Sequence, residues 1–280
     1  MSVRSEPKLP KFVAPRCIAV ANQKGGVGKT TTAVNLAAAM AARGDRILLI
    51  DLDPQGNAST NLGSGRGSTE NDSYRLLTDA DAANLLPQAT GVARLSLIPA
   101  NMDLVGAEIE LVGIAQREHQ LQAALNRLGV LTEYHAVVID CPPSLGLLTI
   151  NALVAADAVL IPLQCEFFAL EGLAHLMRTI ATVRQKLNPG LQIEGILLTM
   201  FDRRNNLSEL VAADARSFFG DKILETVIPR NVRISEAPSH GQPVSTYDPR
   251  SPGALSYARL AEELSQRQTR HVPAALRRPA

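Results

Sequence analysis

The chain has 280 residues, of which 46% are hydrophobic and 20% charged, with a formal net charge of +1 and a mean hydropathy of +0.04. This length and apolar content suit one large globular domain, and they exclude a disordered polyampholyte and a uniformly basic nucleic-acid coat. Tryptophan is absent and aromatic residues make up 4%, which disfavours a binder of unstacked single strands, because such proteins use aromatic stacking platforms.

The cysteines and the two chain ends exclude further classes of protein. Cys17, Cys141 and Cys165 are odd in number and far apart, which favours buried reduced thiols over a disulfide framework or a zinc site. Residues 1–14 are charged and contain proline, and residues 268–280 are rich in arginine and proline, so we expect two flexible tails. No run reaches about 18 uninterrupted apolar residues and the C-terminal end lacks a bulky apolar stripe, so we expect a cytoplasmic protein with no membrane partner.

Short apolar runs alternate with helical patterns along the rest of the chain. Strands are predicted at residues 17–22, 46–54, 95–101, 136–143, 158–164, 193–200 and 223–230. Helices are predicted at 30–44, 103–129, 169–187, 207–219 and 254–267, and 63–73 has the composition of a mobile surface loop. The strands are apolar throughout, which is typical of parallel strands buried on both faces. We therefore predict one α/β domain over residues 15–267, with three layers, helix, sheet and helix, around a mostly parallel twisted sheet.

The segment NQKGGVGKTTT (22–32) follows the first predicted strand and precedes the first predicted helix. Glycines let a backbone turn tightly against a phosphate, and the N-terminus of the following helix favours an anion. Lys29 can reach the β- and γ-phosphates, Thr30 can ligate Mg²⁺, and Thr31 can donate to the α-phosphate. The predicted nucleotide-binding set is Lys24, Gly25, Gly26, Val27, Gly28, Lys29, Thr30 and Thr31. The loop is a variant, because Gln23 stands where the general pattern has its first glycine and a second lysine, Lys24, precedes the glycines.

Two apolar runs end abruptly in aspartate. LLIDLDPQGN (48–57) contains Asp51 and Asp53, and VVIDCPPS (137–144) contains Asp140. The pattern places carboxylates at the carboxyl edge of a parallel sheet, where ligands bind in open α/β folds. Buried carboxylates are costly when unpaired, so Mg²⁺ is their expected partner.

These motifs carry a family resemblance. KGGVGKTT resembles the deviant Walker A loop of the ParA/MinD group of P-loop ATPases, and DxDPQGN and IDCPPSLG resemble its switch I segment and its Walker B with switch II. The resemblance implies a P-loop ATPase domain that hydrolyses ATP with Mg²⁺ as an ATP-sandwich homodimer, with Lys24 acting on the nucleotide held by the partner subunit. It also implies that Asp53 orients the attacking water, Asp51 supports the Mg²⁺ shell and Asp140 holds a metal-bound water. Lys24, Lys29 and Asp53 are then the catalytic residues, and Thr30, Asp51 and Asp140 the metal site.

Later runs extend the resemblance over roughly residues 16–265 and toward chromosomal ParA, also called Soj. They are QCEFFALEGL (164–173), LLTMFDRRNNLS (197–208), IPRNVRISEAPSHG (228–241) and YDPRSPGA (247–254). The match implies adenine contacts at Pro229 and Asn231. It also implies segregation of a chromosome or plasmid, with the ATP dimer bound to nonspecific double-stranded nucleoid DNA and a ParB-like centromere-binding protein stimulating hydrolysis.

Basic charge is concentrated in the second half of the chain. From Arg178 to the end there are 15 lysines and arginines against 10 acidic residues. Arginines near loops or strand ends, with few aromatic neighbours, suit sequence-independent phosphate contacts. The DNA-binding candidates are Arg203, Arg204, Arg230, Arg233 and Arg250. Only about fifteen residues precede the first strand, which disfavours an N-terminal helix-turn-helix module.

Three other functions stay open. The same kind of ATPase could position a cargo other than DNA on the nucleoid. A metabolic P-loop enzyme, such as a cobyrinate or dethiobiotin amidotransfer-type ligase, shares the fold but would need a small-molecule pocket. A reductase of the nitrogenase iron-protein kind shares the loop, but nothing about Cys141 or Cys165 indicates a cluster at a solvent edge.

Overall fold

Eight strands form one sheet in the part of the chain that the structure, a computed structural model, describes: residues 15–64, 70–79, 85–166 and 169–271. Their order is β3-β4-β2-β5-β1-β6-β7-β8, and every neighbouring pair is parallel except β3 with β4. The strands are β1 (Arg16–Val20), β2 (Ile47–Asp51), β3 (Gln88–Ala89), β4 (Leu95–Ile98), β5 (Ala136–Asp140), β6 (Ala158–Gln164), β7 (Gln192–Phe201) and β8 (Ile223–Pro229). The predicted mostly parallel α/β sheet is confirmed.

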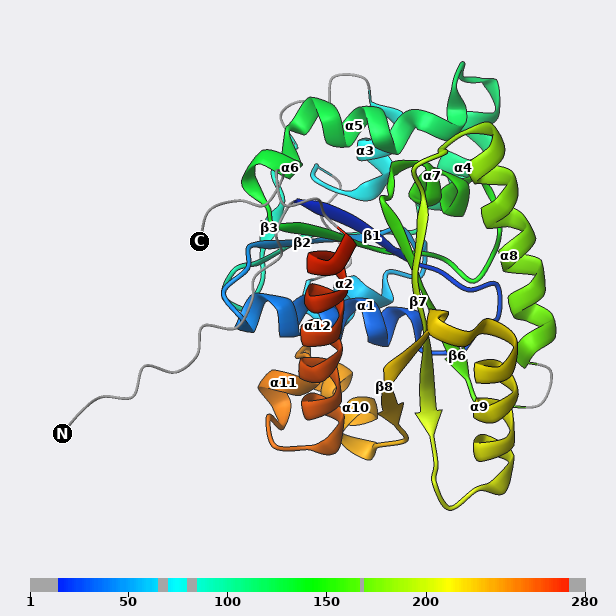
Figure 1. Cartoon of the computed structure of the whole chain (residues 1–280). Helices are drawn as coiled ribbons and strands as arrows, with labels where there is room; N and C mark the ends of the chain where they lie inside the picture. Colours follow the sequence, from blue (N-terminus) through cyan, green and yellow to red (C-terminus); the bar gives the residue numbers. More distant parts are fainter. Residues whose placement is uncertain (1–14, 65–69, 80–84, 167–168, 272–280) are drawn as a thin grey trace.

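Helices cover both faces of the sheet, as Figure 1 shows with α1 and α11 below it and α5 and α7 above it. One face packs on α1 (Lys29–Ala42), α2 (Asn57–Asn61), α10 (Val232–Glu236), α11 (Val244–Tyr247) and α12 (Pro252–His271). The other face packs on α3 (Ser73–Thr78), α4 (Leu104–Glu110), α5 (Gln120–Leu128), α6 (Val130–Glu133), α7 (Leu147–Ala155), α8 (Ala169–Lys186) and α9 (Asn206–Phe219). Short 3-10 turns are η2 (Leu111–Gly113), η3 (Arg117–His119), η4 (Gly220–Lys222) and η5 (Ala237–His240). Every residue of β2 and β5 is buried, because neither face of these central strands meets water.

The predicted single helix over 103–129 is wrong. The structure divides this run into α4, η2, η3 and α5. Gln116 has a φ of 53°, and a residue in the left-handed region cannot continue an α-helix. The apolar spacing continues across the break, which is why periodicity alone did not reveal it.

Other differences concern the ends of elements and the parts of the chain not described. Helix α12 continues to His271, so residues 268–271, predicted as part of a flexible tail, belong to the helix. The predicted tails at 1–14 and 272–280 lie outside the described residues, as does 65–69 of the predicted mobile loop. The three cysteines are buried and free of disulfides, as predicted. Among the described helices, none combines the length and the apolar content needed to cross a membrane.

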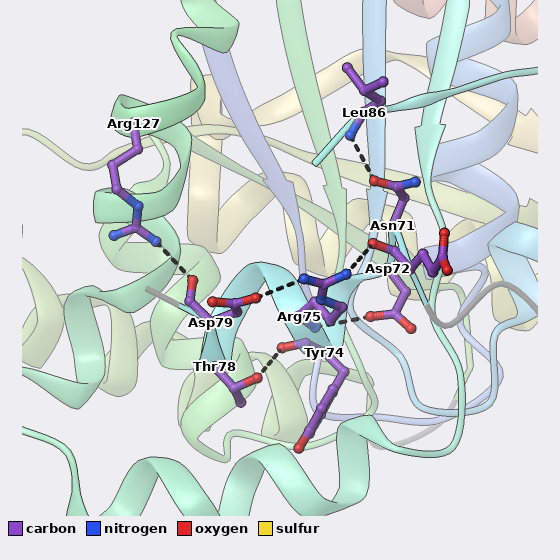
Figure 2. Close-up of polar contacts among 9 residues, drawn as sticks. Asn71, Asp72, Tyr74, Arg75, Thr78, Asp79, Leu86 and Arg127 are labelled. Atoms are coloured by element: carbon purple, nitrogen blue, oxygen red, sulfur yellow. Dashed lines mark hydrogen bonds and ion pairs between the residues drawn. The ribbon is translucent and has the colours of Figure 1, made fainter. Parts of the chain in front are cut away.

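Polar contacts surround the short helix α3, as Figure 2 shows. Asp72 caps this helix, its Oδ1 accepting from the Arg75 N–H at 2.9 Å. Arg75 also pairs with Asp79 one turn later, at 2.8 Å, and Asn71 Oδ1 accepts from the Leu86 N–H at 2.9 Å. The Ser73 hydroxyl contacts the backbone carbonyl of Asp51. The Ser73 contact joins α3 to the end of β2, where the first predicted carboxylates lie.

Candidate functional site

The predicted phosphate loop joins β1 to α1 at the carboxyl edge of the sheet. Gly26 and Gly28 have φ values of 75° and 86°, a region that glycine enters without steric cost. A Cβ added to Gly25 or Gly26 would meet no described atom within 4 Å, so the loop surface there is open to a ligand. The N-terminus of α1 at Lys29 follows at once, and its free N–H groups favour an anion. The loop has the geometry of a phosphate cradle.

Two residues that the sequence analysis did not single out hold this loop in place. The Asn22 amide donates to the Pro162 carbonyl at 2.7 Å, and its Oδ1 accepts from the Lys24 N–H at 3.0 Å. The Thr199 hydroxyl at the end of β7 donates to the Val27 carbonyl at 2.8 Å. Both side chains are almost fully buried. A buried polar residue at the end of an apolar strand was the available signal, because such a group must find a hydrogen-bond partner.

The two lysines of the loop lie in different environments. Lys29 is buried, and its ammonium donates to the Lys24 carbonyl at 2.9 Å. Burial lowers the pKa of Lys29, and the charge of Asp140 opposes that shift. The Lys24 side chain is 40% exposed, and its ammonium lies 3.3 Å from Glu166 Oε2. Lys29 therefore serves its own loop, whereas Lys24 faces outward.

The three predicted aspartates come together as expected. Asp51 and Asp140 are register partners at the ends of β2 and β5, and Asp140 is also the register partner of Val20 on β1. Burial raises the pKa of Asp51 to about 6. Burial also raises the pKa of Asp140 well above its ordinary value, and the charge of Asp51 adds to that shift. The strand order thus concentrates negative charge beside the phosphate loop.

These buried carboxylates differ in how they are satisfied. Asp51 accepts from the Ser59 N–H at 2.9 Å, the Ser59 hydroxyl at 2.7 Å and the Asp53 N–H at 3.1 Å. Neither oxygen of Asp140 has a well-formed hydrogen bond within the described chain, although the Thr30 hydroxyl lies near enough to oppose the rise in its pKa. A buried carboxylate left this way favours a cation.

The donor set fits magnesium. Across residues 15–64, 70–79, 85–166 and 169–271, no three acidic, histidine or cysteine side chains form a metal-binding group. Mg²⁺ commonly keeps several waters and takes few protein ligands together with substrate phosphates, so Thr30 and Asp140 beside the phosphate loop are a suitable pair. Asp51 already accepts three hydrogen bonds, and its charge adds to the rise in the pKa of Asp140.

Replacing Asp140 by asparagine should stabilise the ligand-free protein at neutral pH. The raised pKa means that the unfolded chain loses this proton at a lower pH than the folded chain. The resulting cost to folding is absent below the unfolded pKa and grows as the pH rises. We expect the melting temperature of Asp140→Asn to exceed that of wild type by a few degrees near pH 8, with a smaller difference near pH 5. Stabilisation by magnesium with nucleotide should be lost.

Thermal unfolding across this pH range, with and without magnesium and nucleotide, measures both effects. Asp214→Asn, at an exposed position of α9, is the control. A difference from wild type that does not change with pH would contradict the role of buried charge.

The predicted adenine residues lie at the end of β8, which is separated from β1 by β6 and β7. Pro229 is the last residue of β8, and Asn231 caps α10, its Oδ1 accepting from the Arg233 N–H at 3.1 Å. Pro229 thus ends a strand at the carboxyl edge of the sheet and Asn231 follows it, and their contact with adenine stays a prediction.

Three of the five predicted DNA-binding arginines line one cavity of about 930 Å³ between β7, α9, β8 and α12. Two further exposed arginines that the sequence analysis missed complete the set, here called the arginine groove: Arg203, Arg204, Arg216, Arg230 and Arg259. Three acidic residues, Asp202, Glu209 and Glu225, line the same cavity, and Arg204 pairs with Asp202 at 2.9 Å, so the groove has a small excess of positive charge. Arg216 and Arg259 lie within helices, and only the packing of α9 and α12 brings them to the loop arginines. Arg233 and Arg250 do not line this cavity. Arg233 pairs with Glu236 at 2.8 Å and Asp248 at 3.4 Å.

Comparisons with known proteins agree with this geometry. The family model described as "AAA domain" matches residues 15–193. "Chromosome partitioning protein ParA" of Caulobacter vibrioides (strain NA1000 / CB15N) is 55% identical over 90% of this chain and 95% of its own length. "Sporulation initiation inhibitor protein Soj" of Bacillus subtilis (strain 168) is 54% identical over 89% of this chain and 98% of its own length. The crystal structure of cobyrinic acid a,c-diamide synthase from Mycobacterium smegmatis with bound ADP and magnesium is 37% identical, with a TM-score of 0.80 over 92% of this chain and 96% of that one. The chain therefore belongs to the ParA/Soj family of chromosome-partitioning proteins.

Proposed function

We propose that the chain is a Mg²⁺-dependent ATPase that forms an ATP-sandwich dimer, binds nonspecific nucleoid DNA and segregates a chromosome or plasmid. A ParB-like centromere-binding protein stimulates its hydrolysis. The observation that carries the proposal is the pair of lysines in one loop, with Lys29 buried beside Asp140 and Lys24 facing outward. The identity to ParA and Soj proteins over most of the chain supports it.

The chain's own residues provide the chemistry at the phosphates. The loop N–H groups and the N-terminus of α1 donate to phosphate oxygens. When the nucleotide binds, the Lys29 ammonium leaves the Lys24 carbonyl and donates to the phosphate instead. Thr30 and Asp140 would hold Mg²⁺, which would supply positive charge beside the phosphates. Asp53 is 7% exposed at this edge, and its Oδ1 accepts from the Gln55 N–H at 3.0 Å. This hydrogen bond restrains the carboxylate, whose proposed role is to orient the attacking water.

Lys24 must leave Glu166 before it can contact a nucleotide in a second subunit. The pair is exposed on both sides, and an exposed ion pair contributes only about 0–1 kcal/mol. A triphosphate carries more negative charge than one carboxylate, so the exchange favours the dimer. Lys24 then stabilises charge on the partner's γ-phosphate, as an arginine finger does.

Light scattering with a non-cleavable ATP analogue tests this assignment. Wild type should become a dimer, whereas Lys24→Ala should still bind the analogue but stay a monomer and lose most of its ATP turnover. Lys222→Ala, at an exposed lysine outside the loop, is the control. A wild-type chain that stays monomeric when saturated with the analogue would leave only a nucleotide binder.

The arginine groove should carry DNA binding. Reversing the charge of Arg216 and Arg259 together is expected to weaken the binding of the ATP-bound protein to random duplex by about tenfold or more. It should also reduce the slope of log affinity against log salt by about 0.9 for each lost phosphate contact. Dimerisation should not change, because both side chains are exposed and outside the phosphate loop.

Fluorescence anisotropy across a salt series measures the effect. Arg184→Glu combined with Lys186→Glu, at two exposed positions of α8, makes the same change in charge outside the groove and should bind DNA as wild type does. Equal losses in both variants would show a general charge effect and remove the groove from the interface.

A second candidate function is favoured by the likeness to cobyrinic acid a,c-diamide synthase. An amidotransfer-type ligase would use the same loop for ATP and would be stimulated by a small-molecule acid. ATP turnover with duplex DNA and a centromere-binding protein, compared with turnover in the presence of corrinoid acids and glutamine, distinguishes the two functions.

A further inference from the structure

The segment around α4 is apolar on two sides. Leu104, Ala107 and Leu111 are fully buried in the core. On the opposite side lie four exposed apolar side chains at helical spacing, here called the α4 stripe: Met102 (61% exposed), Val105 (50%), Ile109 (74%) and Val112 (60%). Single exposed apolar residues are common, but a continuous stripe marks an interaction surface. Something other than water is expected to cover it.

Acidic residues flank the α4 stripe. Glu108 follows one side of it around the helix, and Asp103 and Glu110 follow the other. The sequence has no lysine or arginine between Arg94 and Arg117, and Arg117 is itself paired with Glu118 at 3.1 Å. The field at the stripe is therefore negative, which favours a partner with positive charge.

An apolar groove of about 700 Å³ adjoins the stripe at Val112. Its apolar lining comes from the start of α7 on one side and the end of α8 on the other, and includes Leu145, Leu147, Ile150 and Val183. Two arginines, Arg117 and Arg178, and two glutamates, Glu108 and Glu118, also line the groove, so the excess of negative charge lies at the α4 stripe. We call it the α7–α8 groove. The α4 stripe and the α7–α8 groove together form an extended apolar surface. An amphipathic helix binds such a surface through apolar side chains about one helical turn apart.

We propose that the α4 stripe and the α7–α8 groove dock an amphipathic helix of another protein, whose apolar face is flanked by lysine or arginine. The surface adjoins the loop between Asp140 and α7. Glu108 Oε1 accepts from the Leu148 N–H at 3.5 Å, and an added Cβ at Gly146 would collide with the Glu108 carboxylate. A bound helix would thus contact the residues that pack on this loop. The proposal does not depend on the proposed function, because docking is measured without nucleotide or DNA.

The test uses two designed helical peptides with the same leucine stripe, one flanked by lysines and one by glutamates. Fluorescence anisotropy should show at least fivefold tighter binding of the lysine peptide to the full chain. Ile109→Ser should weaken this binding about tenfold, as for an interface anchor. Phe218→Ser is the matched control, because Phe218 on α9 is 76% exposed against 74% for Ile109. Asp103→Lys should reduce the preference for the lysine peptide.

Hydrogen exchange in the presence of the lysine peptide should show protection at residues 102–114 and 145–150. Circular dichroism checks that the variants fold. We expect Ile109→Ser to fold, because the Ile109 side chain is exposed and not part of the core. Equal affinity for the two peptides, or equal loss in Ile109→Ser and Phe218→Ser, overturns the proposal. Self-association of the peptide-free wild type that Ile109→Ser abolishes would assign the stripe to a second copy of the chain and also overturn it.

Discussion

Replacing Lys29 by alanine is expected to weaken nucleotide binding by about a hundredfold or more, since a charged hydrogen bond contributes about 1.5–3 kcal/mol and an ammonium can donate more than one such bond to phosphate oxygens. Lys29 is the only lysine that the described chain buries at the phosphate loop. Its ammonium is held by the Lys24 carbonyl, at the position where phosphate oxygens are expected. Isothermal titration calorimetry with ATP and magnesium measures the loss.

Lys24→Ala is the matched control for this prediction. It removes the same charge from the same loop, but at an exposed position paired with Glu166, so binding to the chain's own nucleotide should be retained. The ligand-free Lys29→Ala protein should still fold, because the Lys29 ammonium donates to a carbonyl of its own loop and joins no distant element by a hydrogen bond in the described chain. Nucleotide affinity equal to that of wild type would refute the assignment of the loop.

Replacing Asp53 by alanine should remove hydrolysis while leaving nucleotide binding intact. Loss of a group that positions and deprotonates water lowers turnover by about 10²–10⁴-fold. Because hydrolysis is what returns the proposed dimer to monomers, the variant should accumulate as a dimer on DNA. Within the described chain, the Asp53 carboxylate accepts a hydrogen bond from the neighbouring Gln55 N–H and joins no distant element, so the fold should tolerate the change.

Size-exclusion chromatography with ADP or ATP, with and without duplex, follows the dimer, and phosphate release follows turnover. Asp214→Ala is the control for a lost carboxylate at an exposed site. The variant should elute as a dimer with ATP and as a monomer with ADP, and only the dimer should be retained on duplex. Wild-type turnover in Asp53→Ala would contradict the role of Asp53.

The sequence predicted the parallel core well, because strands buried on both faces show as continuous apolar runs. The range predicted for β6, 158–164, agrees with Ala158–Gln164. Prediction failed where the backbone conformation of one residue ended a helix. The left-handed conformation of Gln116 breaks the run 103–129 into separate helices, although the spacing of its apolar residues continues across the break. The two-residue strand β3 was also missed, since its residues carry no alternating pattern.

For the site, local motifs predicted the loop and the three aspartates, because each motif lies at the end of an apolar strand. What they could not predict was contact between distant segments. Glu166 meets Lys24, and Thr199 meets Val27, only after β6 and β7 are in place. The arginine groove has the same origin, since Arg216 and Arg259 are ordinary exposed helix positions until α9 and α12 pack beside β8.

The placement of β5 between β1 and β2 has a consequence for biosynthesis. The loop after β1 and the aspartates after β2 leave the ribosome early, yet the strands that carry them do not pair with each other. A nascent chain that ends before Ala136 lacks the strand that joins them and therefore cannot assemble the binding edge. A ligand that binds only the native state stabilises it by mass action, so ATP can assist folding only after the middle of the chain has been translated.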